Sequence, residues 1–140
     1  MSQYSKEFIL FVSTIAGEAG NCSSASWKVI AHVIMNRFKY KEWRKHQTIK
    51  DIILETGFDA ATQKNQPFLS AYNSLSAGKP SPLVLRIIAA VRPIYDGMIK
   101  DPTGKVVLYY SPRAQSSLSR SKPHLYKPTP AWNFKSIHYY

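Results

Sequence analysis

The sequence predicts a single α+β domain over residues 1–140, mainly helical, with a small antiparallel sheet from the C-terminal half. Two observations predict the helices: apolar side chains recur at the helical period, and capping residues stand before these stretches. A third predicts the sheet, because β-prone runs at 106–110 and 132–140 flank a loop rich in proline and serine. The length suffices for one core, and no Gly/Ser-rich linker divides the chain.

The expected helices follow in order. The first carries the apolar residues of 4–15, and the glycines at 17 and 20 indicate its end and a turn. Serines at 23–26 offer caps for the second, whose apolar face extends to Phe38. Three more helices are expected over 48–54, 65–77 and 81–99, and Pro93 should kink or break the last of them.

The charge and composition favour some classes of binding partner and argue against disulfides, metal clusters and membrane spans. The net charge of +11 predicts attraction to a polyanion, whether nucleic acid, an acidic membrane surface or an anionic cell wall. Cys22 is the single cysteine, so no internal disulfide and no thiolate metal cluster is expected. No apolar stretch is long enough to span a bilayer, and the N-terminus lacks the pattern of a secretory signal. We therefore expect synthesis in the cytoplasm.

One carboxylate differs from the others in its surroundings. Glu18 follows an apolar helix and is flanked by glycine and alanine, which would let a bulky substrate approach closely. A carboxyl group held against apolar surroundings favours its neutral form and can donate a proton near neutral pH. An ordinary loop carboxylate is the alternative that the residues alone leave open. The sequence has eight carboxylates: Glu7, Glu18, Glu42, Asp51, Glu55, Asp59, Asp96 and Asp101.

Several short motifs occur in a fixed order along nearly the whole chain. They are Ala16-Gly17-Glu18-Ala19-Gly20, a helix ending in Asn36-Arg37, Gly57-Phe58-Asp59, Asp101-Pro102-Thr103-Gly104, Leu108-Tyr109-Tyr110-Ser111-Pro112, and Trp132 ahead of Ile137-His138-Tyr139-Tyr140. In these motifs and their order the chain resembles the cell wall hydrolase family of the spore cortex-lytic enzymes. The resemblance implies a lysozyme-like domain that acts on peptidoglycan.

The resemblance also implies a reaction. Glu18 would be the general acid for cleavage of the β-1,4 bond from N-acetylmuramic acid to N-acetylglucosamine. If Glu18 acts alone, the sugar's own 6-hydroxyl attacks and the enzyme is a lytic transglycosylase. If a second carboxylate activates water, the enzyme is a muramidase. Asp59 is the candidate for that second group and stands where a serine is common in the family, although a helix N-cap explains it equally well.

Further residues are expected to bind the substrate. Asn36 would orient Glu18 or bind an N-acetyl group, and a buried structural hydrogen bond is its alternative. Arg37 would face the anionic wall, and Phe58 belongs to the same candidate set. Tyr109, Tyr110 and Ser111 would line a groove, unless the tyrosines only pack a strand. We expect a monomer without a metal or cofactor.

Two other classes of protein compete with the hydrolase. A nucleic-acid-binding module would explain the basic and aromatic run over 38–46, although no motif that reads nucleic acid is recognisable. A zinc hydrolase is less well supported, because the side chains that could bind zinc lack ligand spacing. They are His32, His46, His124, His138 and Cys22. A phage endolysin or a secreted antibacterial effector would fit, and an effector implies an immunity protein or delivery machinery as a partner.

Overall fold

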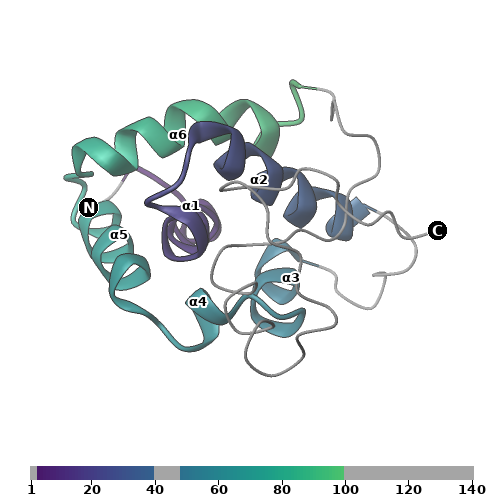
Figure 1. The fold of residues 1–140 in the computed structure, drawn as a ribbon, viewed down its shortest axis with the longest axis horizontal. Coiled ribbons are helices and arrows are strands. Elements are labelled where there is room, and N and C mark those ends of the chain that lie inside the picture. Colours follow the sequence, from purple (N-terminus) through teal and green to yellow (C-terminus); the bar gives the residue numbers. More distant parts are fainter. Residues whose placement is uncertain (1–2, 40–47, 100–140) are drawn as a thin grey trace.

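The computed structural model describes residues 3–39 and 48–99, and this part of the chain forms six helices (Figure 1). They are α1 (Lys6–Ala19), α2 (Ser24–Lys39), α3 (Ile49–Glu55), α4 (Asp59–Thr62), α5 (Gln66–Ser76) and α6 (Pro82–Tyr95). The longest of them has 16 residues. None of the described helices combines the length and apolarity needed to cross a membrane.

The core is built around α1. In Figure 1 this helix is seen end-on near the centre, with α6 and α2 above it, α5 on one side and α3 and α4 below. Its buried residues occupy every side of the helix, including Phe8, Phe11, Val12 and Ile15. A helix that is apolar on all sides is stable only when other helices cover it. The surrounding helices therefore bury α1, and its last turn lies inside the molecule.

Side chains cap five of the described helices at their first turns. Ser5, Ser23, Thr48, Asn65 and Ser81 each accept a hydrogen bond from the backbone N–H three residues later. These bonds satisfy N–H groups that have no partner within the helix. The caps confirm the predicted starts at Thr48, Asn65 and Ser81.

One of the expected helix ends is confirmed and another is wrong. α1 ends at Ala19 with Gly20 as its C-cap, as the glycines on both sides of Glu18 indicated, and Gly17 lies within its last turn. α6 ends at Tyr95 rather than near Ile99. Pro93 is tolerated within α6, and the chain turns at Gly97, which has a φ of +75°. The N–H of Met98 donates to the carbonyl of Pro93 at 2.8 Å and closes this end of the helix.

The expected α+β class is wrong for the part of the chain that the structure describes. Residues 3–39 and 48–99 form helices, turns and bends, with no strand. Most of the large apolar side chains of these residues are buried between helices, so the described helices form a core without a sheet. The two runs assigned to the sheet, 106–110 and 132–140, lie outside the described residues.

Candidate active site

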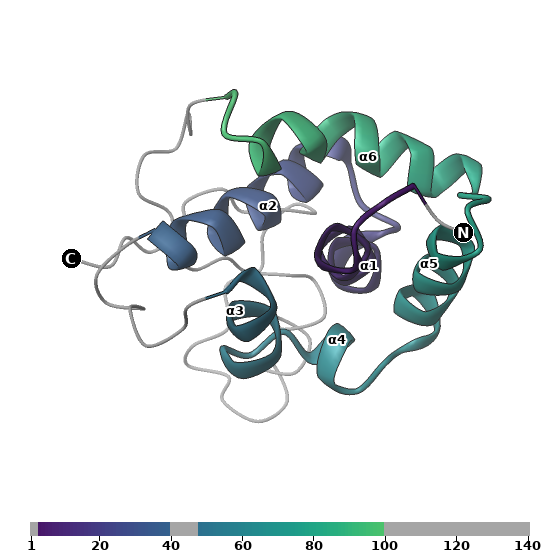
Figure 2. The same cartoon turned by 180° about the vertical axis from the view of Figure 1, so that it is seen from behind.

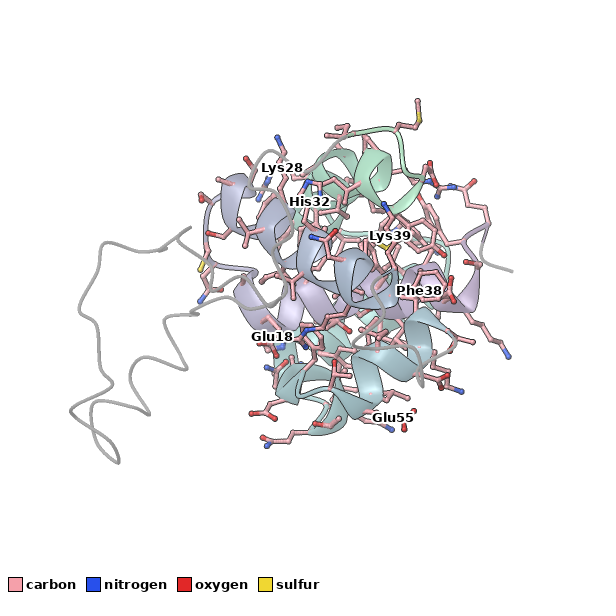
Figure 3. The ribbon with its side chains drawn as sticks, turned by 90° about the vertical axis from the view of Figure 1, so that its right-hand side faces the viewer. Glu18, Lys28, His32, Phe38, Lys39 and Glu55 are labelled. Carbon is pink, nitrogen blue, oxygen red and sulfur yellow. The ribbon has the colours of Figure 1, made fainter. Side chains whose placement is uncertain are left out.

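Glu18 is held by a helix that lies far from it in the sequence. It is half-buried in the last turn of α1, and its Oε2 accepts a 2.8 Å hydrogen bond from the backbone N–H of Ala60 in α4. Figure 3 shows Glu18 beneath α2, beside the teal ribbons. A hydrogen bond to a charged acceptor is stronger than one between neutral groups. The bond therefore fixes the carboxyl group relative to α4.

The place of Glu18 in α1 does not stabilise that helix. The carbonyl end of a helix carries partial negative charge, which disfavours a carboxylate in the last turn. The first turn of α4 supplies the opposite partial charge, and its Ala60 N–H meets the same carboxylate. A contact between two helices, rather than helix propensity, therefore accounts for a glutamate at this position.

Gly17 allows α1 to approach α4 and α5 closely. A Cβ atom built on Gly17 would lie 2.6 Å from the Cβ of Ala60 and 2.9 Å from Oδ1 of Asn65. Carbon atoms pack at about 3.5–4.0 Å, so no larger residue fits without movement. We had expected this glycine to admit the substrate. The structure shows instead that it admits α4, and the close packing sets the bond between Glu18 and Ala60.

Asn65 connects α1 to the start of α5. Its Nδ2 donates to the carbonyl of Gly17 at 3.1 Å, while its Oδ1 accepts from the N–H of Phe68 at 3.0 Å. One amide therefore caps α5 and satisfies a carbonyl next to Glu18. On the other side of the turn, Nε1 of the buried Trp27 donates to the carbonyl of Ala19 at 2.7 Å. These two side chains fix the backbone on both sides of Glu18.

A cleft of about 270 Å³ opens beside Glu18. Small residues form much of its wall, with Ala16, Gly17, Ala19 and Gly20 from the end of α1. Asn21, Cys22 and Pro67 complete the lining. The described lining is mostly small side chains, which leaves room for a ligand beside the carboxyl group.

Asp59 lies next to the anchor of Glu18 but not in the cleft. It is the exposed first residue of α4, and it directly precedes Ala60. The structure does not support the N-cap explanation, because Phe58 occupies that position and no side chain makes the capping bond. Glu18 bonds the free N–H of Ala60 instead. The backbone of Asp59 is thus near Glu18, while its side chain is outside the lining of the cleft.

Asn36, Arg37 and Phe58 lie in the interior. They are 4%, 6% and 1% exposed, respectively. Nη1 of Arg37 donates to the carbonyl and to Oγ1 of Thr56, both at 2.9 Å, and the guanidinium stands 5.1 Å from the centre of the Phe58 ring. Arg37 therefore ties α2 to the segment between α3 and α4. Tyr109, Tyr110 and Ser111 lie outside the described residues.

Comparison with known protein families identifies the chain. A family model described as Cell Wall Hydrolase matches residues 23–133, which is most of the sequence. The chain belongs to the cell wall hydrolase family. This confirms the resemblance found in the sequence motifs, and it makes the protein a hydrolase that acts on peptidoglycan. No curated protein and no solved structure matches the chain.

The matched range covers part of the candidate site of this cell wall hydrolase. It includes α2 to α6, and with them Asp59, Ala60 and Asn65. Tyr109, Tyr110 and Ser111 also lie within it, while Glu18 precedes its first residue by five positions. The match therefore supports the family, and the case for Glu18 rests on its motif and on its contact with α4.

Among residues 3–39 and 48–99, no group of three or more His, Cys, Asp or Glu side chains is placed to hold a metal ion. His32 is buried in α2, and Cys22 lies in the cleft beside Glu18. His46, His124 and His138 lie outside the described residues. The described part of the hydrolase therefore gives no support to a zinc mechanism.

Sequence reasoning missed the residues that position Glu18. Asn65 was recognised only as the start of a helix, and Trp27 only as part of an apolar face. Their bonds to the carbonyls of Gly17 and Ala19 depend on how α1 meets α5 and α2. The one signal in the sequence was Gly17 itself, since a glycine within an apolar helix indicates a close approach by another part of the chain.

Proposed function

We propose that this hydrolase cleaves the β-1,4 bond from N-acetylmuramic acid to N-acetylglucosamine, with Glu18 as the general acid. The observation that carries the proposal is the placement of Glu18. Its carboxyl group lines a cleft of small residues and is fixed by the N–H of Ala60. Protonation of a glycosidic oxygen needs one oriented carboxylic acid within reach of the leaving group.

The other described carboxylates are less suited to this role. Glu7 accepts a 2.6 Å hydrogen bond from the hydroxyl of Tyr95, and Asp96 forms an exposed ion pair with Arg92. Asp51 is in the first turn of α3, where a carboxylate stabilises the helix. Glu55 is exposed on α3. Among the described acids, Glu18 is the one that lines the cleft at the end of α1.

A larger cavity of about 680 Å³ includes Glu7 in its lining, and its size alone would favour it as the active site. Its floor is mainly apolar, with leucine and aromatic side chains, whereas a glycan strand presents hydroxyl and amide groups along its length. The carboxylate of Glu7 is also bound by Tyr95. We therefore assign the glycan to the smaller cleft at Glu18.

The hydrogen bond to Ala60 defines how Glu18 would donate its proton. Oε2 must act as an acceptor toward this N–H, so the proton of the neutral acid would lie on Oε1. Transfer of that proton to the bridging oxygen would release one sugar as an alcohol. The remaining sugar would pass through an oxocarbenium-like transition state that a nucleophile must capture.

We further propose that water is the nucleophile, which makes the enzyme a muramidase. Asp59 is the base in this proposal, because it directly precedes the residue that anchors Glu18, and its exposed side chain, which does not line the cleft, would reach the water from outside it. An ionised carboxylate at this place could accept a proton from the attacking water. Without such a base, the 6-hydroxyl of the sugar would attack and leave a 1,6-anhydro end.

The decisive substitution is Glu18→Gln. The amide oxygen can still accept from the Ala60 N–H, so the fold should persist, but the amide cannot donate a proton in place of the acid. We expect the rate of turbidity loss of purified peptidoglycan to fall by about 10²–10⁴-fold. Glu55→Gln is the matched control, since it removes an exposed carboxylate from α3. Retained activity in Glu18→Gln, with the same melting curve, would refute the assignment.

Mass spectrometry of the released fragments tests the role of Asp59. A muramidase leaves reducing N-acetylmuramic acid ends, and Asp59→Asn should slow their release while leaving the fold unchanged. Anhydro ends from the unsubstituted enzyme would exclude the hydrolytic mechanism and leave Glu18 as the acid of a lytic transglycosylase.

The site of action is proposed from charge. A net charge of +11 favours adsorption to an anionic wall, which agrees with action on the cell wall after release or delivery. An endolysin or an injected effector would meet its substrate in this way. Binding to purified wall should weaken as salt rises. An inactive protein with salt-sensitive DNA affinity would instead support the nucleic-acid-binding alternative.

A further inference from the structure

The cavity of about 680 Å³ has no role in the proposed reaction. Its lining comes from the N-terminal half of α1 and from α3, α4, α5 and the turn between α4 and α5. Figure 2 shows these helices from behind. No described residue lines both this cavity and the cleft at Glu18. Its volume is in the range of cavities that hold small molecules, about 300–1,000 Å³.

The inner wall of this cavity is apolar. Leu10, Leu54 and Leu69 line it, together with Phe68 and Tyr72, whose rings stack with centres 5.7 Å apart. Leu54 remains 37% exposed, and Leu10, Leu69 and Tyr72 are only partly buried. Covering this apolar surface with a hydrocarbon chain would be favourable.

Positive charge surrounds the apolar wall. Lys6, Lys50 and Lys64 line the cavity from three different elements, and all three are exposed. Among the described lining residues the carboxylate of Glu7 is the one acidic group, and it accepts the hydrogen bond from Tyr95. Lysine side chains can lay their methylene groups along an apolar ligand while the ammonium group stays at the surface. The lining therefore has an excess of positive charge.

Lys64 stands in a backbone conformation that a lysine rarely adopts. Its φ is +50°, and it is the described residue other than glycine with a positive φ. Glycine or asparagine would occupy such a turn with less strain. Lys64 therefore occupies this turn at a conformational cost, and its ammonium group lies at the cavity. A strained residue of this kind is consistent with a binding role for its positive charge.

We propose that this cavity binds an amphiphile with an anionic head and one alkyl chain, of the kind represented by a fatty-acid anion. The alkyl chain lies against the leucines and the Phe68–Tyr72 pair. The head group meets the ammonium groups of Lys6, Lys50 and Lys64. The site is independent of the role proposed for Glu18, so either proposal can fail without the other.

Titration calorimetry of the full chain with dodecanoate, below the concentration at which it forms micelles, tests the proposal. We expect saturable binding of one dodecanoate per chain, weakened by salt, and much weaker binding of dodecyltrimethylammonium and dodecanol. Replacing Lys6, Lys50 and Lys64 together by glutamine should weaken binding by about tenfold, as for several exposed ion pairs. Asn73→Trp, from an exposed position at the cavity, should block binding by filling it.

The matched control replaces Lys28, Lys39 and Lys79 by glutamine. These lysines are exposed and lie outside the cavity lining, so the net charge changes equally while the site is unchanged. Equal weakening in both triple variants would overturn the proposal, because binding would then depend on overall charge. Equal affinity for the cationic or neutral amphiphile would also overturn it, as would binding to anionic phospholipid vesicles without binding to dodecanoate.

Discussion

At the scale of single residues, the environment of Glu18 depends on Gly17, the residue before it, which has no side chain. Gly17 has no Cβ, and this lets the backbone of α1 approach Ala60 until the carboxylate meets its N–H. Glu18 gains its orientation from this contact, since the last turn of α1 offers it no favourable charge. The orientation of the Glu18 carboxylate therefore depends on the small size of the residue before it.

Gly17→Ala should impair the site more than the fold. The added methyl would lie 2.6 Å from the Cβ of Ala60, and overpacking costs about 1–3 kcal/mol. Alanine recovers up to about 1 kcal/mol through its higher helix propensity. We expect a loss of about 1 kcal/mol in urea unfolding and a fall in peptidoglycan hydrolysis of at least about tenfold, because α4 must move away from Glu18.

The control for this substitution is Ala89→Gly, at an exposed position within α6. It should cost about 1 kcal/mol through helix propensity alone and leave hydrolysis unchanged. If both variants lose activity in proportion to stability, the packing of Gly17 has no specific role at the site.

At the scale of elements, α4 illustrates how a short helix is maintained by its neighbours. Four residues are too few to form a stable helix alone. Glu18 supplies the bond to its first turn, and buried Ala60 and Ala61 fix it to the core. The next connection, at Asn65, anchors both the start of α5 and the end of α1.

Substitutions of Asn65 separate these two functions. Asn65→Asp keeps an oxygen that can cap α5 but loses the donor to the Gly17 carbonyl and places two acceptors together. We expect a loss of about 1–2 kcal/mol with a fall in hydrolysis. Asn65→Ala also removes the cap, which adds about 1 kcal/mol.

Ser81→Ala provides the comparison, because it removes only the cap of α6. It should cost about 1 kcal/mol in thermal or urea unfolding without a change in hydrolysis. Normal activity in Asn65→Asp, measured well below its melting temperature, would exclude a positioning role for the amide.

At the scale of the whole molecule, aromatic contacts join the two ends of the described chain. Tyr95, in the last turn of α6, packs edge-on against Phe8 of α1, with ring centres 4.9 Å apart. Its hydroxyl donates to Oε1 of Glu7 at 2.6 Å. Burial and this hydrogen bond raise the pKa of Tyr95 from 10.0 to about 12.

The raised pKa of Tyr95 predicts a pH dependence of stability. The neutral phenol is favoured in the folded state, so its stabilising contribution is complete below about pH 10 and is lost as pH rises through about 12. Tyr95→Phe should therefore destabilise the protein at pH 8, and the difference from the unsubstituted protein should shrink between pH 10 and 12. Urea unfolding across this range measures both effects.

Glu7→Gln refines the test, since it keeps an acceptor oxygen but removes the negative charge that opposes ionisation of the phenol. The pKa of Tyr95 should then fall. Ultraviolet titration measures it as the difference between two proteins that both carry Glu7→Gln, one with Tyr95 intact and one with Tyr95→Phe. An unchanged titration would show that Glu7 does not contribute.

Local signals explain which parts of the fold could be predicted. The helix starts at Thr48, Asn65 and Ser81 depend on side chains that bond a backbone N–H three residues away, so the sequence contains both partners. The helical spacing of apolar residues likewise depends on neighbours within one or two turns. The end of α1 beside Gly20 was also predicted from local signals, whereas α6 ends at Tyr95 rather than near Ile99.

The sequence by itself determined the helical character of the described chain, the family, and Glu18 as the carboxylate with unusual neighbours. Only the tertiary structure decided that Gly17 makes room for α4, that Ala60 holds Glu18, and that Phe58 and Arg37 are interior residues. The physical reason is the distance along the chain. Glu18 and Ala60 are separated by 42 positions, and no local pattern encodes a contact that exists only after the helices have packed.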